Sequence, residues 1–464
     1  MSPPKAKAFA IHSLAHVQTW ANAEDHLVKD ALRLALPATG EQILSLLVGL
    51  VDTFLVGHLG AASLAAVGLS NQWVMLVMTF FGAVGTGTTA LIARATGAGD
   101  ETLAQRTLRQ SLLLGLLLGF LASFLAYSLA GSAIALLGAK EDASGLAIVY
   151  LRTVALVLPL SGLMFIGNAA MRGAGDTRTP LKVMLAVNLI NITVAWVLIN
   201  GPLGLPRFGV LGSALGAVAG RLTGGVLVVF WLFQGRANLQ LCLRGMRLDI
   251  PLIRRVLHVG LPTGIEQLLF RFALMTFVAI IASLGTAAYA AHQVAINGES
   301  LSFMPGFGFG VAATTLVGQN LGARKPERAR YSGYLAYGLG GGLMSIMGLV
   351  FFLFARQIVG FFTDDPQVIA LGATPLRMVA IVQPFLAAAI IFAGALRGAG
   401  DTRYPMFVNG ASAWCIRVPL AYLLAHVLGL GLTGAWMAMI IDLTVRGTLE
   451  FVRFRGGRWT HIQV

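Results

Sequence analysis

Residues 34–57 read LALPATGEQILSLLVGLVDTFLVG, an apolar stretch that contains two acids, Glu41 and Asp52. A helix needs about 20 mainly apolar residues to cross the hydrocarbon core of a bilayer, and this stretch is long enough. Its beginning recurs 225 residues later, where LPTGIEQ at 261–267 resembles LPATGEQ at 36–42. The pattern predicts a membrane-crossing helix that the chain contains twice.

The composition of the whole chain agrees with a membrane location. Of 464 residues, 57% are hydrophobic and only 11% are charged, with a mean hydropathy of +0.79. Soluble domains carry about 25% charged residues, so a soluble enzyme, a disordered protein and a disulfide scaffold are all excluded. The two cysteines, Cys242 and Cys415, support neither a disulfide framework nor a zinc cluster. We therefore predict an all-α polytopic membrane protein without a metal site.

Apolar runs of spanning length occur twelve times along the chain. In chain order they cover 34–57, 65–92, 110–137, 148–170, 180–200, 209–233, 256–284, 287–317, 332–355, 369–395, 405–428 and 431–452. The connecting loops are too short for a separate soluble domain. The first 30 residues are polar and mixed, without the apolar core of a signal peptide.

The basic residues indicate the orientation of these spans. If the N-terminus is cytoplasmic, the inside loops and both ends hold 24 of the 33 Lys and Arg residues. The outside loops then hold only Lys140, Arg207 and Arg356. Because cytoplasmic loops are enriched in Lys and Arg, we expect both termini in the cytoplasm and the protein in the cell's inner membrane. The net charge of +14 thus reflects the Lys and Arg residues of the cytoplasmic loops and not a nucleic-acid-binding surface. We expect no nucleic-acid partner.

A second repeated motif divides the chain into two halves. RGAGDTR followed by one residue and proline occurs at 172–180 and again at 397–405, with the same offset of 225 residues. We interpret each copy as a tight basic turn on the cytoplasmic side that anchors one span to the next. The predicted organisation is given by four segments: a cytoplasmic arm at 1–30, an N-lobe with spans 1–6 at 31–245, a C-lobe with spans 7–12 at 246–455, and a cytoplasmic tail at 456–464.

Six spans per repeat is an even number, so both lobes start and end on the same side and the repeats are parallel. Two such six-helix lobes enclose a central cleft, and rocking one against the other exposes that cleft to each side in turn. Duplication that only builds a stable scaffold is the structural alternative.

The sequence also limits the energy source. None of the six lysines follows a glycine, so a Gly-Lys-Ser/Thr phosphate loop is missing, and no soluble region could house a nucleotide. No HExxH motif indicates a membrane-embedded metalloenzyme. We therefore expect no enzymatic activity and no cofactor beyond a coupling ion, either H⁺ or Na⁺.

Acids within spans are the main functional candidates, because each costs about 2.5–3.5 kcal/mol on insertion scales. Asp52 and Glu266 are predicted to bind the coupling cation. Glu41 and Glu299 are predicted to shape the cleft, and Asp442 is a further candidate. Polar residues that could line the cleft beside them are Gln42, Asn71, Gln72, Asn188, Asn191, Gln267, His292, Gln293, Asn297 and Gln383.

Ion pairing with a buried arginine is the structural alternative for each acid. Arg221, Arg271 and Arg417 lie within predicted spans and are available. Arg271 lies about 140° around the helix from Glu266, so we expect no pair between them within span 7, while Glu299 in span 8 is within reach of Arg271.

These residues resemble the multidrug and toxic compound extrusion (MATE) family of cation-coupled antiporters, over roughly residues 28–455. The resemblance is carried by Pro37, by the sequence VDT at 51–53 that runs into VGHLG at 56–60, by 262–266, and by both RGAGDTR-x-P motifs. It implies twelve helices in two lobes and export of organic, often cationic and amphipathic compounds against inward Na⁺ or H⁺. The family's cation-binding aspartate of span 1 matches Asp52, and the glutamate of span 7 matches Glu266.

The sequence departs from that family at one position. The multidrug/sodium branch commonly carries an aspartate in span 10 shortly after a Gln-Pro pair. Here Gln383-Pro384 is followed by Phe385 and Leu386, so the pattern predicts an incomplete cation site in the second lobe.

Our first hypothesis is a secondary antiporter that exports small organic cations or amphipathic compounds and works as a monomer in the lipid bilayer. A lipid-linked oligosaccharide flippase of related architecture is the second hypothesis. A membrane enzyme or scaffold without transport is the third.

Overall fold

In its described part, the computed structural model of this chain consists of helices joined by short turns and loops. It describes residues 5–201, 206–235, 239–242 and 248–462, with side chains from His26 onward. The helices of the first half are α1 (Lys5–Gly57), α2 (Ala61–Ala98), α3 (Glu101–Ser128), α4 (Ala130–Leu136), α5 (Glu141–Ala155), α6 (Leu158–Gly173), α7 (Arg178–Asn200) and α8 (Val210–Phe233). Those of the second half are α9 (Ile250–Ala282), α10 (Thr286–Gly322), α11 (Pro326–Phe362), α12 (Pro366–Gly398), α13 (Arg403–Ser412), α14 (Val418–Tyr422) and α15 (Gly431–Arg455).

Most predicted spans coincide with one helix, and three regions differ. The run at 110–137 is divided between α3 and α4, and the run at 148–170 is divided between α5 and α6, which meet at 55°. The run at 405–428 is one continuous helical path that contains π-helical turns at 413–417 and 423–427. The bend between α5 and α6 comes just before Pro159, which cannot donate a backbone hydrogen bond to the preceding turn.

Ten helices in the described ranges are long and apolar enough to cross a bilayer, or eleven if the bent pair counts as one span. α15 is long enough but falls outside this group, since it carries Asp442, Arg446, Glu450 and two further arginines. The prediction of an all-helical, multi-span membrane protein is confirmed at this level.

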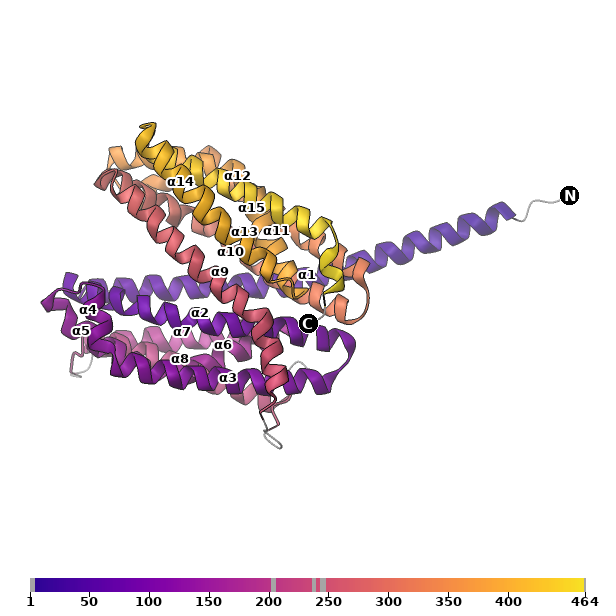
Figure 1. Cartoon of the computed structure of the whole chain (residues 1–464), viewed down its shortest axis with the longest axis horizontal. Coiled ribbons are helices and arrows are strands. Elements are labelled where there is room, and N and C mark those ends of the chain that lie inside the picture. Colours follow the sequence, from indigo (N-terminus) through magenta and orange to yellow (C-terminus); the bar gives the residue numbers. More distant parts are fainter. Residues whose placement is uncertain (1–4, 202–205, 236–238, 243–247, 463–464) are drawn as a thin grey trace.

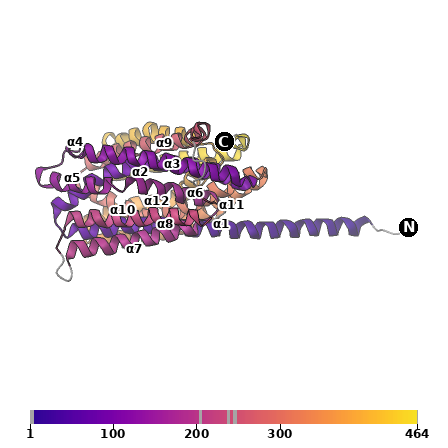
Figure 2. The ribbon, with the colours of Figure 1, turned by 90° about the horizontal axis from the view of Figure 1, so that it is seen from below.

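α1 is longer than predicted. It begins at Lys5, so most of the predicted N-terminal arm is helical and continuous with the first span. Its first half projects beyond the other helices in both views (Figures 1 and 2). The C-terminus lies toward the same end of the bundle as this projection (Figure 1).

The helices form two groups that are close at the end nearest the C-terminus and diverge toward the other end (Figure 1). α1 and α9 connect the groups. Ala31 and Leu34 near the start of the α1 span pack in the apolar core of α10–α15, whereas Val56 at its end packs with α2, α4 and α5. α9 does the reverse, with Val256 in the core of α2, α3 and α6 and Phe277 in the core of the second group.

Candidate functional site

Both RGAGDTR motifs form the same turn at the end of a helix. Gly175 after α6 and Gly400 after α12 have φ of 93° and 85°, in the left-handed region that favours glycine. Asp176 N–H donates to the Met171 carbonyl at 2.9 Å, and Asp401 N–H donates to the Leu396 carbonyl at 2.8 Å. This pattern is the Schellman ending of a helix, which confirms the interpretation of the motif as a tight turn.

The arginine that opens each motif points back into the helices and pairs with a predicted site acid. Arg172 donates to Glu41 Oε1 at 2.8 Å, and Arg397 donates to Glu266 Oε1 at 2.6 Å. The two pairs are related by the 225-residue repeat, because both acids and both arginines occupy equivalent positions. Glu266 accepts a second hydrogen bond on the same oxygen, from Asn409 at 2.6 Å.

These pairs correct the premise that the acids within the spans lack a basic partner. The arginines considered as partners from sequence were Arg221, Arg271 and Arg417, whereas the real partners of Glu41 and Glu266 were counted as loop residues. An arginine side chain is long, so its guanidinium can lie several ångströms from its own Cα. An arginine at the end of a helix can therefore place its charge inside the span. Arg271 donates to Met75 Sδ at 3.4 Å, and in the part of the chain that the structure describes it forms no ion pair with Glu299.

Asp52 has different surroundings. Its Oδ2 accepts a hydrogen bond of 3.3 Å from Asn191 on α7, and its Oδ1 is buried without a hydrogen-bond partner. No ion pair to Asp52 occurs in the described part of the chain. Arg221 on α8 interacts electrostatically with both Asp52 and the buried Tyr150. Arg221 Nη1 is itself buried without a hydrogen-bond partner. The Arg221 guanidinium and the Asp52 carboxylate thus interact through their charges without forming an ion pair.

A larger charged cluster lies within the second group of helices. Asp442 is fully buried, and its Oδ2 accepts from Arg417 Nε at 2.8 Å and from Arg446 at 2.8 Å. Its Oδ1 accepts from Ser412 at 2.5 Å. Asp442 is therefore held as a structural ion pair. Glu299 is buried near Arg417 and forms no ion pair within the described ranges.

The predicted polar lining residues are not gathered at one place. Asn188 is buried and donates to the Leu44 carbonyl at 2.8 Å, which joins α7 to α1 beside the Asp52 site. Gln383 is fully buried in α12 with both amide atoms unpartnered. His292 is also buried, with its ring against those of Phe277 and Trp436. Six further predicted lining residues are exposed or partly exposed: Gln42, Asn71, Gln72, Gln267, Gln293 and Asn297.

The last turns of α2 and α10 are in direct backbone contact. A β-carbon at Gly97 would overlap the Gln319 carbonyl oxygen, and one at Gly322 would overlap the Arg94 carbonyl oxygen. Gly97 corresponds to Gly322 in the 225-residue repeat, and Arg94 corresponds to Gln319. Each half therefore makes the same contact with the other half. Thr315 on α10 also donates to the carbonyl of Arg172, at 2.9 Å, and thereby connects this contact to the first RGAGDTR turn.

Comparison with known proteins identifies the family. The sequence matches MatE over residues 37–197 and again over 262–423, once in each half. The chain belongs to the MatE family. These proteins are transporters and not enzymes, which confirms both the resemblance seen in the sequence and the prediction of no enzymatic activity.

Several relatives named as multidrug resistance proteins or probable multidrug resistance proteins match the chain nearly end to end. The chain is 35% identical over 437 residues to a probable multidrug resistance protein NorM of Thermotoga maritima, covering 93% of each. It is 30% identical to the multidrug resistance protein PmpM of Pseudomonas aeruginosa, covering 92% of this chain and 91% of that protein. A solved outward-facing multidrug resistance MATE transporter of the MOP superfamily superimposes with a TM-score of 0.87 and 25% identity, covering 93% and 95%.

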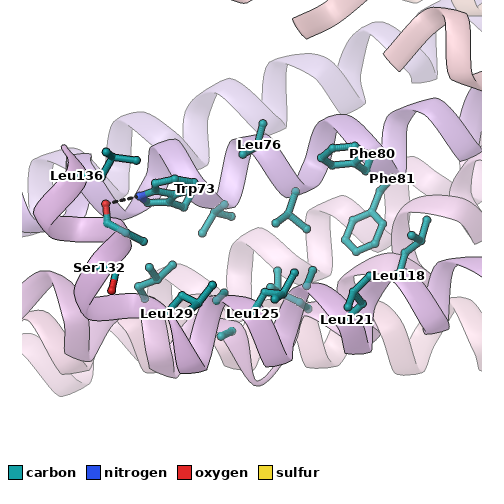
Figure 3. Close-up of a pocket in the computed structure, with 18 residues that line it drawn as sticks. Trp73, Leu76, Phe80, Phe81, Leu118, Leu121, Leu125, Leu129, Ser132 and Leu136 are labelled. Atoms are coloured by element: carbon teal, nitrogen blue, oxygen red, sulfur yellow. Dashed lines mark hydrogen bonds between the residues drawn. The ribbon is translucent and has the colours of Figure 1, made fainter. Parts of the chain in front are cut away.

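One apolar cavity of this MatE protein lies away from all the predicted acids. It has a volume of about 540 Å³ and lies between α2, α3, α4 and the α5–α6 bend (Figure 3). Phe80, Leu121 and Leu125 line it and are exposed, as expected for a crevice that faces lipid tails. Trp73 donates its indole N–H to the Ala133 carbonyl at 3.2 Å, so that polar group is already used.

Sequence reasoning missed several charged residues of this MatE chain. Arg172 and Arg397 could have been found, because each repeats at the same offset as the acid that it binds. Glu450 on α15 was not singled out, although it is fully buried with both carboxylate oxygens unpartnered. Its only sequence signal is its place in the last predicted span.

Proposed function

We propose that this protein is a proton-coupled antiporter that exports organic, often cationic compounds from the cytoplasm. The single observation that carries the proposal is Asp52 on the membrane-spanning helix α1, whose Oδ1 is buried without a hydrogen-bond partner. A carboxylate in such a place is costly unless a cation or a proton neutralises it. A carboxyl group that alternately takes and releases a proton is the simplest way to couple a proton gradient to export.

The surroundings of the acids favour a proton over Na⁺. Guanidinium groups already supply positive charge near Asp52, from Arg221, and at Glu266, from Arg397. This fixed positive charge opposes the binding of either cation. A Na⁺ ion also needs several oxygen ligands, whereas the partners at these carboxylates are nitrogen donors from Asn191, Arg397 and Asn409. A proton adds to a carboxylate oxygen without a shell of further oxygen ligands.

We further propose twelve spans in two parallel six-helix lobes, with α15 as the twelfth span and both termini cytoplasmic. Although α15 is too polar to count by composition, its Asp442 and Arg446 neutralise each other inside the lobe. The protein would work as a monomer in the inner membrane.

Alternating access would follow from the contact between α2 and α10. Backbone packing at Gly97 and Gly322 supports a cytoplasmic end that is closed in this structure, while the helix groups diverge at the other end (Figure 1). Rocking the lobes about α1 and α9, which pack in both cores, would break this contact and open the cytoplasmic side.

Ethidium efflux from energised vesicles tests the proposal through Asp52→Asn. Asp142→Asn is the matched control, because Asp142 is an exposed acid in the first turn of α5. We expect proton-driven efflux to be lost in Asp52→Asn and kept in Asp142→Asn. Undiminished efflux in Asp52→Asn would contradict the proposal.

A further inference from the structure

Glu450 is a fully buried acid that forms no ion pair among the residues that the structure describes, and the proposed function leaves it unused. It lies in the last two turns of α15 with 0% exposure, and neither carboxylate oxygen has a hydrogen-bond partner. An unpaired, unsolvated carboxylate is costly, whereas the neutral acid avoids most of that cost. The surroundings therefore favour a bound proton at Glu450.

Close helix packing keeps water from this residue. Gly447, one turn before Glu450, lies so close to α12 that a β-carbon would overlap the Phe385 carbonyl oxygen. Because only glycine allows this approach, α15 and α12 pack backbone to backbone beside Glu450.

Charged and ionisable groups on several neighbouring elements interact electrostatically with Glu450. The elements contribute Arg397 from α12, Glu266 from α9, Asp401 from the second RGAGDTR turn, Tyr404 from α13, and Arg446 from α15 itself. Two of these are already bound elsewhere: Asp401 pairs with Arg453 at 2.8 Å, and Arg446 pairs with Asp442 at 2.8 Å.

Arg397 is the group that connects the two acids. It donates through Nη2 to Glu266 Oε1, while its Nε is buried without a partner. Glu266 Oε2 is likewise buried and unpartnered. The guanidinium thus has an unused donor. Glu266 pairs with it and Glu450 interacts with it electrostatically, and the two acids have three unused oxygens in total.

We propose that Glu450 is a second proton-binding residue, which shares Arg397 with Glu266. In this structure Arg397 pairs with ionised Glu266, and Glu450 carries the proton. In the alternative state the O–H bond of Glu450 breaks, a proton is bound on Glu266 Oε2, and Arg397 turns to Glu450. The three groups have a total charge of zero in both states, so the exchange moves no net charge into the lobe.

This inference rests on the proposed proton coupling, but infrared spectroscopy can test it without transport. Protonated carboxyl groups have a C=O stretching band that carboxylates lack. The purified full-length protein is measured at neutral pH as the wild type, as Glu450→Gln and as Glu266→Gln. Glu327→Gln is the control, since the Glu327 side chain is 83% exposed at the start of α11.

We expect Glu450→Gln to lose one protonated-carboxyl band that the wild type and Glu327→Gln retain. Glu266→Gln should lose the same band, because Arg397 then has only Glu450 to pair with and ionises it. A full set of bands in Glu450→Gln would overturn the proton at Glu450. If Glu450→Gln fails to fold, an unchanged band in Glu266→Gln would overturn the shared arginine, and its loss would support it.

Transport then separates this inference from the proposed function. Proton-driven efflux should be lost in Glu450→Gln, while exchange of substrate without a gradient remains. Wild-type efflux that ignores the proton gradient would contradict the proposed function, whereas the infrared band would still report on Glu450.

Discussion

Arg94 on α2 and Gln319 on α10 occupy equivalent positions in the two halves, and each donates a hydrogen bond to the turn of the opposite half. Arg94 reaches the Ala399 carbonyl at 2.8 Å, and Gln319 reaches the Gly173 carbonyl at 3.1 Å. Because Ala399 and Gly173 lie in the two RGAGDTR turns, these motifs do more than end a helix. They join the two halves at the end where α2 and α10 meet.

Alanine at Gly97 or Gly322 should destabilise the protein. The added methyl group meets a backbone carbonyl that cannot rotate away, and overpacking of this kind costs about 1–3 kcal/mol. Gly342→Ala is the matched control, because a β-carbon there meets open space inside α11, and alanine should stabilise that helix by up to about 1 kcal/mol. Thermal unfolding in detergent measures both, and a drop of the melting temperature in Gly342→Ala alone would contradict the expected packing.

The pair of Arg397 and Glu266 should contribute to stability as a unit. Arg397→Gln leaves a buried carboxylate without its cation, and breaking such a pair costs about 3–5 kcal/mol. The double variant Glu266→Gln with Arg397→Gln should recover part of this loss, because it leaves no unpaired charge. A double-mutant cycle from unfolding measurements tests this, and strictly additive effects would argue against the pair. Arg172 and Glu41 provide the same cycle in the first half.

Asn191 and Asn188 offer a matched comparison on α7. Asn191 donates to the Asp52 carboxylate, whereas Asn188, one turn earlier, donates to a backbone carbonyl of α1. Asn191→Ala should reduce proton-driven efflux several-fold. Asn188→Ala should lower the free energy of unfolding by about 1 kcal/mol and leave coupling intact. Equal effects of both variants on efflux would mean that Asn191 has no special role at Asp52.

Asp249, just before α9, should make stability depend on pH. Its pKa is lowered by the backbone N–H of Leu252 and by the Arg106 guanidinium, to which it binds at 2.6 Å. A lowered pKa in the folded state adds stability above the unfolded pKa of about 3.9, and this stability is lost as the pH falls below it. Asp249→Asn should therefore have a lower melting temperature than the wild type at neutral pH. The difference should shrink below about pH 4, and a difference that is constant with pH would contradict this origin.

The membrane-spanning helices could be predicted from sequence because their signal is local. A run of apolar residues needs about 20 positions to be recognised, and residues 34–57 contain that information by themselves. The break between α3 and α4 and the bend between α5 and α6 were missed, since the segments on both sides of each break are rich in apolar residues. Hydropathy reports the environment of a segment and not its direction.

The candidate site was less predictable, because its contacts join residues far apart in the chain. Asp52 and Asn191 were both named as polar residues of the first half, yet nothing local indicates that they form a hydrogen bond. Arg397 was counted as a loop charge, although its side chain lies against Glu266. The repeat was the best guide, since a contact in one half implies its counterpart in the other.

Efflux from proteoliposomes with pH and Na⁺ gradients imposed separately tests the central claim most directly. We predict that a pH gradient alone drives efflux of an organic cation, that a Na⁺ gradient alone does not, and that Asp52→Asn removes the pH-driven component. Efflux driven by Na⁺ at uniform pH, or efflux by the wild type that is indifferent to both gradients, would contradict the account.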